Sequence, residues 1–459
     1  MENPFLTPRL REIVQSNDSS ALQDLCASLH PGSVAEFLKD LQIQEIRHIL
    51  GLLEPRLGAE IFGELDLEIQ IELAESMKRQ ELARIVNFMS HDERVDLLKR
   101  IPEEKQETLM PALAQVERED IRRLFSYEEG TAGSVMTSDY ATLSPDQTVR
   151  EALAKLRREA PDKETIYYSY VVDQSRRLVG FLSLKDLIIA RPDKRVEELM
   201  HRDLIYAHVT DDQEEAARKI AKYDLIALPV VNGRGELVGI ITHDDAIDII
   251  NQEHTEDMEK FMAIAGSHET GAYLRTPPWE HFKNRCVWLI VLSAMGLVSG
   301  YIVQRFEGLL LQFAILATFM PMLADTGGNT GSQSATLIVR ALAVREISPG
   351  DIMKVLWKEF SVGLPMALLL AGLAFARVVF FAGSSSRPQG YPLSEIGLAV
   401  GVALGLQVLT SALIGALLPM AAVKLRLDPA VVASPALTTV VDITGLFLYF
   451  TTVRVLLGV

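Results

Sequence analysis

One acidic residue lies inside an otherwise uncharged run near the carboxyl end of the chain. Asp442 interrupts the apolar stretch 429–453, and no basic residue follows it until Arg454. A carboxylate at membrane depth costs roughly 2.5–3.5 kcal/mol on insertion scales, so such a residue is expected to be functional. With no cationic partner along its own span, the expected ligand of Asp442 is a cation. Thr438 lies on the same helical face and could hold the water of that ion.

A second polar feature is the small-residue run 321–333, PMLADTGGNTGSQ. Its glycines, including Gly328, let backbones approach closely, while Asn329 and Gln333 supply oxygens without charge. We expect irregular backbone at the cytoplasmic end of a second span, which lipid tolerates only when it is buried in protein or lines a wet cavity. Asp325 belongs to the same run. The alternative is that the small residues only pack helices together.

The residue types favour a hard cation. Mg²⁺ holds its water shell tightly, so one carboxylate per subunit plus neutral oxygens can hold the hydrated ion. A transition-metal pore would more often recruit Cys, His or Met. Cys286 is the only cysteine of the apolar half, and no histidine follows His281.

Five long apolar runs position these residues, at 286–303, 308–324, 360–382, 396–423 and 429–453. Each approaches or exceeds the roughly 20 residues that a helix needs to cross a bilayer. Basic residues gather in alternate loops, which predicts a cytoplasmic amino terminus, five crossings and an outside carboxyl terminus. Five helices make a small bundle for a pore, so a homodimer is expected.

The charges separate the chain of 459 residues into two halves. Of its 45 Lys and Arg and 61 Asp and Glu, only 11 and 8 lie at 284–459, so residues 1–283 carry a net charge of −19 and the rest +3. Nucleic-acid binding is not expected of such an acidic surface. Two distant cysteines exclude a disulfide scaffold. The amino-terminal stretch lacks the apolar core of a signal peptide, so the acidic half is expected in the cytoplasm.

The acidic half divides into a helical region and a duplicated one. Residues 1–125 read as short amphipathic helices, for example at 57–65, 69–77, 82–89 and 94–101, and predict a solenoid-like bundle without catalytic residues. Residues 135–250 contain two copies of one pattern displaced by 59 positions: VVD, LVG, Ser183 and Asp186 recur as VVN, LVG, Thr242 and Asp245. Each copy predicts two strands and a helix capped by Ser or Thr. An acidic helix is expected at 244–265.

Over its whole length the chain resembles the MgtE family of magnesium channels. The resemblance rests on 127–137 (YEEGTAGSVMT), 164–173 (ETIYYSYVVD), 212–223 (DQEEAARKIAKY), 327–337 (GGNTGSQSATL) and 428–446 (DPAVVASPALTTVVDITGL). It implies a multidomain α-helical membrane protein with a cytosolic α-superhelical N domain (1–130), an α/β tandem pair of CBS domains (131–197 and 198–252), a connecting plug helix and linker (253–283) and a five-helix transmembrane domain (284–459).

The resemblance also assigns residues. Asp442 would hold the hydrated ion, with Thr438, Gly328, Asn329 and Asp325 near its path. Regulatory Mg²⁺ would bind acids of the CBS pair, the plug helix and the membrane side: Asp212, Glu214, Asp224, Asp245, Asp248, Glu253, Glu256, Asp257 and Asp428. Glu60, Asp92 and Asp96 would serve the contact of the N domain with the CBS pair. In the CBS family Ser183 and Asp186 would contact ATP, and helix capping is the alternative.

Electrostatics agrees with this expectation. A body of charge −19, doubled in a dimer, repels itself, and divalent ions that bridge its carboxylates favour a compact state in which the acidic helix blocks the pore. The expected function is therefore an inner-membrane, Mg²⁺-selective channel or transporter, without enzymatic activity, closed by cytosolic Mg²⁺. Two alternatives stay open: transport of another divalent cation such as Co²⁺ or Ni²⁺, and a membrane-anchored nucleotide or Mg²⁺ sensor without a pore.

Overall fold

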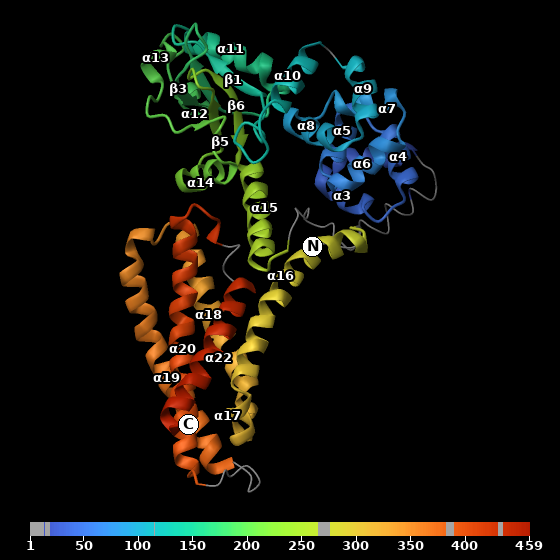
Figure 1. Cartoon of the computed structure of the whole chain (residues 1–459). Coiled ribbons are helices and arrows are strands. Elements are labelled where there is room, and N and C mark those ends of the chain that lie inside the picture. Colours follow the sequence, from blue (N-terminus) through green and yellow to red (C-terminus); the bar gives the residue numbers. More distant parts are fainter. Residues whose placement is uncertain (1–12, 14–18, 114, 265–275, 382–389, 430–434) are drawn as a thin grey trace. The chain divides into compact units, whose positions relative to one another are not determined.

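The computed structural model (Figure 1) describes residue 13, residues 19–113, 115–264, 276–381, 390–429 and 435–459. The chain divides into two compact units, Met1–Glu253 and His254–Val459.

The first unit begins with short helices that pack their apolar faces together. They are α2 (Ser19–Ser28), α3 (Pro31–Leu38), α4 (Ile43–Leu52), α5 (Pro55–Gly63), α6 (Leu67–Ser76), α7 (Arg79–Val86), α8 (His91–Arg100), α9 (Glu103–Leu109) and α10 (Gln115–Phe125). In α7 the buried residues are Leu82, Ala83, Ile85 and Val86, which is the spacing of one helical face. The four helices expected at 57–101 therefore exist, each beginning two or three residues earlier than the periodicity predicted.

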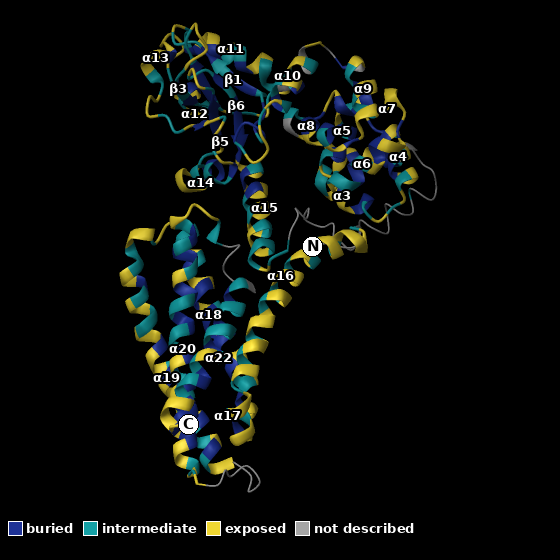
Figure 2. Cartoon of the chain, viewed as in Figure 1, coloured by how far each residue is buried: buried dark blue, intermediate teal, exposed yellow. Residues whose placement is uncertain are grey.

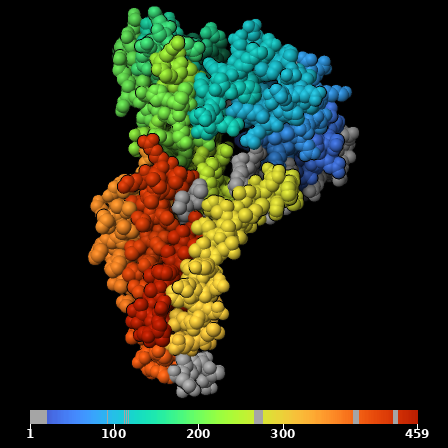
Figure 3. All heavy atoms as spheres, in the orientation of Figure 1, coloured from blue at the N-terminus to red at the C-terminus, as the bar shows by residue number. Residues whose placement is uncertain are grey.

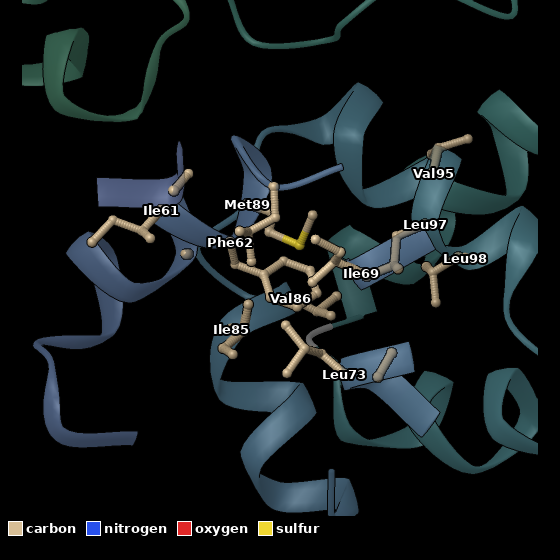
Figure 4. Packing of buried hydrophobic residues seen from close by; sticks show 14 of the residues in the cluster. Ile61, Phe62, Ile69, Leu73, Ile85, Val86, Met89, Val95, Leu97 and Leu98 are labelled. Atoms are coloured by element: carbon tan, nitrogen blue, oxygen red, sulfur yellow. The ribbon is translucent and has the colours of Figure 1, made fainter. Parts of the chain in front are cut away.

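Phe62 occupies the centre of this helical core. Figure 4 shows its ring among Val86 and Met89, and both Phe62 and Val86 are fully buried. Burying a side chain of this size contributes about 1.5–3 kcal/mol, so the short helices are stabilised by packing on one another.

The duplicated region forms two small sheets of equal topology. The first has the order β1 (Tyr140–Leu143), β2 (Thr165–Val172), β3 (Leu178–Ser183), and the second β4 (Ala207–His208), β5 (Ala227–Val231), β6 (Leu237–Thr242). In both sheets the first pair of strands is parallel and the second antiparallel. The helices of the repeats are α11 (Val149–Glu159), α12 (Leu184–Ile189), α13 (Val196–Leu199) and α14 (Gln213–Tyr223). The predicted duplication is confirmed.

The glycine of each LVG motif has a packing reason. A Cβ atom at Gly180 would lie 2.8 Å from the sulfur of Met200, and one at Gly239 would lie 2.5 Å from the sulfur of Met136. Met136, near the start of the first repeat, thus covers Gly239 of the second repeat. In the same way Met200, near the start of the second repeat, covers Gly180 of the first. Helix α15 (His243–Phe261) follows the second repeat.

The second unit is a bundle of long apolar helices. It contains α16 (Pro278–Arg305), α17 (Glu307–Gln312), α18 (Met320–Ala343), α19 (Ile352–Phe381), α20 (Leu393–Lys424) and α22 (Pro435–Leu457). Among α16, α19, α20 and α22, helix α20 is the most enclosed: 67 % of the residues in its most apolar 18-residue stretch are buried. In the corresponding stretch of α16 no residue is buried. Figure 2 shows this contrast, and Figure 3 shows α16 and α22 side by side on one face.

Four of these helices are long and apolar enough to cross a membrane: α16, α19 (with the turn that precedes it), α20 and α22. The expected second span at 308–324 was wrong, because that segment is divided between α17, a 3₁₀ turn at Ala314–Phe319 and the start of α18. The long helix begins later, at Met320, and its polar glycine run lowers its hydropathy. The irregular backbone expected at 321–333 was also wrong, since the whole run lies within α18.

Candidate ion pathway and its cytosolic acids

The glycine run of α18 packs directly on α22, the helix that carries Asp442. A Cβ atom at Gly328 would lie 3.5 Å from the methyl group of Thr438, and one at Gly331 would lie 3.3 Å from Val441. Small residues therefore let the two helices approach closely. The structure brings together the two polar motifs that the sequence separates by more than one hundred positions.

Polar side chains extend from these two helices beyond the close contact. Asp442 and Thr438 both lie in α22 and are partly buried, four residues apart and thus on one face. Asp325 and Asn329 lie in α18 and are exposed in the single chain, with the Asn329 amide donating to Asp325 at 3.0 Å. Carboxylate, amide and hydroxyl oxygens are the groups that can hold the water shell of a hard cation.

Two further polar residues of the bundle were not predicted. Gln407 in α20 is 1 % exposed and donates from Nε2 to the main-chain oxygen of Leu323 at 2.8 Å, while its Oε1 has no partner among the described residues. Glu359 in α19 accepts a hydrogen bond of 2.7 Å from Ser334, which is buried. A lone amide inside the run 396–423 was a usable signal for Gln407. Glu359 was missed because it adjoins Lys358 at the edge of a predicted span.

The end of α15 contacts the same bundle. Phe261 packs against a buried cluster of Ala335, Leu437 and Val441, and Val441 is the neighbour of Asp442. The preceding residue, Lys260, lies 2.6 Å from Glu256 and 3.3 Å from Asp428. Burial lowers the pKa of Lys260, but the hydrogen bonds and charges of Glu256 and Asp428 more than offset this, so the pKa is raised overall.

The acids of the CBS pair occupy ordinary structural places in the single chain. Asp212 caps α14 by accepting from the main-chain nitrogens of Glu214 and Glu215, and Glu214 pairs with Arg218. Asp224 ends α14 in the left-handed region, with φ of 51°. Asp245 accepts from Thr242.

Along α15, Glu253 accepts a hydrogen bond of 2.6 Å from Gln213. Asp248 and Asp257 are exposed on the same helix. Burial and the nearby charge of Asp244 raise the pKa of Asp248. A cation bound near this carboxyl group would favour its ionised form.

The acids expected to serve the N domain are dispersed. Glu60 pairs with Arg56 at 3.3 Å, Asp96 is exposed on α8, and the side chain of Asp92 lies outside the described residues. Across the described part of the chain, no three His, Cys, Asp or Glu side chains come together so as to hold a metal ion. The regulatory residues assigned by resemblance therefore stay predictions.

The predicted caps of the repeats are confirmed at Ser183. Its hydroxyl accepts from the Asp186 nitrogen and donates to the Asp186 carboxylate at 2.6 Å. Asp186 also lies 3.4 Å from His201, whose ring packs on Phe181. Phe181 lines a small apolar cavity of about 60 Å³ together with Tyr168 and Pro229, which are surfaces that suit a flat ring.

Known families cover nearly the whole chain. The model of the MgtE intracellular N domain matches residues 29–130, that of the CBS domain matches 132–193 and 196–252, and that of the MgtE divalent cation transporter matches 320–452. The chain is 38 % identical to the magnesium transporter MgtE of Thermus thermophilus over 98 % of both chains. It is 33 % identical to that of Bacillus subtilis, over 92 % of this chain and 91 % of the relative.

Two solved structures resemble its first unit. The soluble part of a magnesium transporter superimposes with a TM-score of 0.52 at 33 % identity, over 54 % of this chain and 97 % of that one. The cytosolic domain of the Mg²⁺ channel MgtE in complex with ATP superimposes with a TM-score of 0.50 at 39 % identity, over 53 % and 99 %. Relatives match the chain over nearly its whole length, three domain families match it in order, and Gly328 of α18 packs on Thr438 of α22. The chain therefore belongs to the MgtE family of magnesium transporters.

Proposed function

We propose that this protein conducts Mg²⁺ through the inner membrane as a homodimer, with its first unit in the cytoplasm and its carboxyl terminus outside. The observation that carries the proposal is the packing of the Gly328 region on the helix of Thr438 and Asp442. This packing sets Thr438 against the glycine run, on the two helices that also carry Asp325, Asn329 and Asp442. A hydrated divalent cation satisfies such a set, because outer-sphere contacts need few charged ligands.

The exposed face of α18 supports the dimer. Asp325, Asn329 and Gln333 are exposed in the single chain, although α18 belongs to an apolar bundle. A charged side chain facing lipid is costly, and a second copy that turns the same face toward a shared axis removes that cost. The axis would then run along the residues proposed to contact the ion.

Cytosolic Mg²⁺ closes this channel through α15. Phe261 already rests on the helices that carry the polar motifs, and Glu256 and Asp428 approach one another around Lys260. Cations bound among these acids and those of the CBS pair would favour the position of α15 against the bundle. Such ions shift the equilibrium only if they bind that state more tightly.

ATP acts as a modulator at the aromatic cavity beside Asp186. Tyr168 and Pro229 would enclose the base, while Asp186 would accept from the ribose. The relative with bound ATP supports this proposal.

Flux measurements on the full-length protein in vesicles test the function. A Mg²⁺-sensitive dye inside the vesicles should report entry through the wild type and none through Asp442→Ala. Raised Mg²⁺ on the cytoplasmic side should close the wild type but not a variant with Asp248, Glu253 and Asp257 neutralised. Entry of Co²⁺ or Ni²⁺ in preference to Mg²⁺ would favour the other divalent cations, and wild-type vesicles without flux would favour a sensor.

A further inference from the structure

A cavity of about 920 Å³ lies within the first unit, where helices α8 and α10 meet the first CBS repeat. That volume is within the usual range for small-molecule sites. Five permanent cations line it, although residues 1–283 are strongly acidic: Arg123, Lys155, Arg158, Lys163 and Arg176. The cavity shares no residue with the aromatic cavity beside Asp186.

Three of the acids in the wall are neutralised by their neighbours. Asp120 pairs with Arg123 and lies 2.7 Å from His91. Asp139 lies 3.8 Å from Lys163 and 3.4 Å from His91. Glu159 lies 4.0 Å from Lys155.

Two arginines of the cavity wall, Arg158 and Arg176, have no carboxylate partner among the described residues. Arg176 donates to the Tyr140 hydroxyl at 3.0 Å, and that hydroxyl donates to the main-chain oxygen of Leu237. Neither Arg176 nor Arg158 has an acidic partner among the described residues, and both are exposed to the cavity side of the surface. The Nε of Arg123 is buried and also lacks an acceptor within the described part of the chain. Three guanidiniums therefore have unused donors in one cavity.

Arg176 is held in place by its own turn. Its backbone is in the left-handed region, with φ of 61°, and the Asp173 carboxylate accepts from the nitrogens of Ser175 and Arg177 on either side. Together with the bond to Tyr140, this turn fixes the guanidinium at the cavity edge. The side chain of Arg176 therefore loses less conformational entropy on binding a ligand than a free surface arginine would.

We propose that this cavity binds a polyphosphate-type anion. The planar fork of an arginine matches two phosphate oxygens at once, and a chain of phosphates can span several forks. Because Arg123 belongs to the N domain whereas Arg158 and Arg176 belong to the first CBS repeat, the anion ties the two domains together. Its consequence for the channel rests on the proposed function: a docked N domain would make closure by Mg²⁺ easier.

Calorimetry with inorganic tripolyphosphate tests the site on full-length protein in detergent, without Mg²⁺. We expect Arg158→Gln with Arg176→Gln to weaken binding by at least about tenfold, as expected when charge-assisted bonds are lost. The matched control is Arg157→Gln with Arg191→Gln, which removes two exposed arginines outside the cavity and should leave binding unchanged. Absence of binding to the wild type, or an equal loss in the control, would overturn the proposal.

Lysine substitutions at both positions keep the charge but remove the fork, so they should bind with intermediate affinity and also guard against a misfolded glutamine variant. Binding of ATP to the same variants distinguishes this cavity from the aromatic cavity beside Asp186. If tripolyphosphate loses affinity in the glutamine variant while ATP loses affinity only when Ser183 and Asp186 are replaced by alanine, the two cavities are separate sites, as proposed. If ATP and tripolyphosphate both lose affinity only when Ser183 and Asp186 are replaced by alanine, the anion belongs to the other cavity and the proposal is wrong. None of these measurements uses ion flux.

Discussion

Gln407 in α20 donates a hydrogen bond of 2.8 Å to the main-chain oxygen of Leu323 in α18, and its amide also lies against Gly445 of α22. A Cβ atom at either Gly327 or Gly445 would lie 2.4 Å from Nε2 of Gln407. One buried amide thus sets the spacing of three helices, among them both helices that carry the proposed ion ligands. The glycines provide the space that the amide needs.

Gly445→Ala is therefore expected to displace Gln407 and break its bond to Leu323. Hydrogen bonds between membrane helices contribute about 1 kcal/mol, so we expect a modest loss of thermal stability in detergent together with a larger loss of Mg²⁺ flux. Adding Gln407→Ala should restore stability in part, because it removes the side chain that the new methyl group meets. Additive losses in the double variant would contradict this account. Gly296→Ala, where no atom lies within 4 Å of the new Cβ, is the control.

Asp442→Asn should abolish Mg²⁺ flux while the protein still folds. The amide is nearly isosteric but lacks the charge that attracts a hydrated divalent ion, so binding in the pathway is lost. Glu395→Gln, at the exposed first turn of α20, removes an equal charge and should conduct normally. Flux through Asp442→Asn at the wild-type rate would exclude this residue from the pathway.

Lys260→Gln should make the channel close at lower cytosolic Mg²⁺. The ammonium group now lies between Glu256 and Asp428, and its removal leaves the two carboxylates to be bridged by a divalent ion. We expect a shift of a few-fold in the Mg²⁺ concentration for half closure, since the pair is partly screened by solvent. Lys283→Gln, which removes a lysine from exposed α16, should not shift the curve. A shift toward higher Mg²⁺ would mean that Lys260 stabilises the closed position itself.

The sequence predicted those parts of the fold that depend on local pattern. The displaced repeat at Val171 and Val230 gave both sheets, because alternation and turn residues are local signals. The second span was misplaced because hydropathy favoured 308–324, whereas α18 is stabilised by close packing of its glycines on α20 and α22. That packing depends on partners far along the chain.

The candidate site was predictable to a similar extent. Asp442 stood out because a lone acid in an apolar run is costly, but the role of Gln407 depends on Gly327 and Gly445, which only the folded bundle brings to it. The cavity at Arg158 and Arg176 was likewise invisible in the sequence, since its walls come from α10, α11 and a strand turn.

His91 of the N domain lies between two carboxylates, Asp120 of the same domain at 2.7 Å and Asp139 of the first CBS repeat at 3.4 Å. Burial lowers the pKa of His91, but the bond to Asp120 and both negative charges raise it more, so the pKa lies above its ordinary 6.5 despite the opposing charge of Arg94. The protonated ring attracts Asp139 across the contact of the two domains, so protonation of His91 favours the docked N domain. This contribution is fully present below about pH 6.5 and is lost as the pH rises through the raised value.

The carboxylates do not reverse this dependence. Burial raises the pKa of Asp139, so its protonation also favours docking at low pH, even though His91 and Lys163 lower that pKa in part. Burial also raises the pKa of Asp120. Its hydrogen bonds to His91 and Ser138 and the charges of His91 and Arg123 lower the pKa by more than burial raises it, so the pKa lies below its ordinary value of 3.8. Asp120 therefore titrates outside the range that concerns His91.

Docking of the N domain should consequently weaken between about pH 6 and pH 8. Pulsed EPR distances between spin labels on exposed positions of α6 and α11 would measure it in the full-length protein, and the fraction at the short distance should fall as the pH rises. His91→Gln keeps a hydrogen-bonding side chain without the titrating proton, so its docking should be independent of pH in this range. Asp139→Asn removes the acid of the CBS repeat that faces His91, so it should weaken the pH dependence of docking. If His91→Gln retained the wild-type dependence, another group would have to hold the proton, and the closeness of His91 to both carboxylates would have only a structural role.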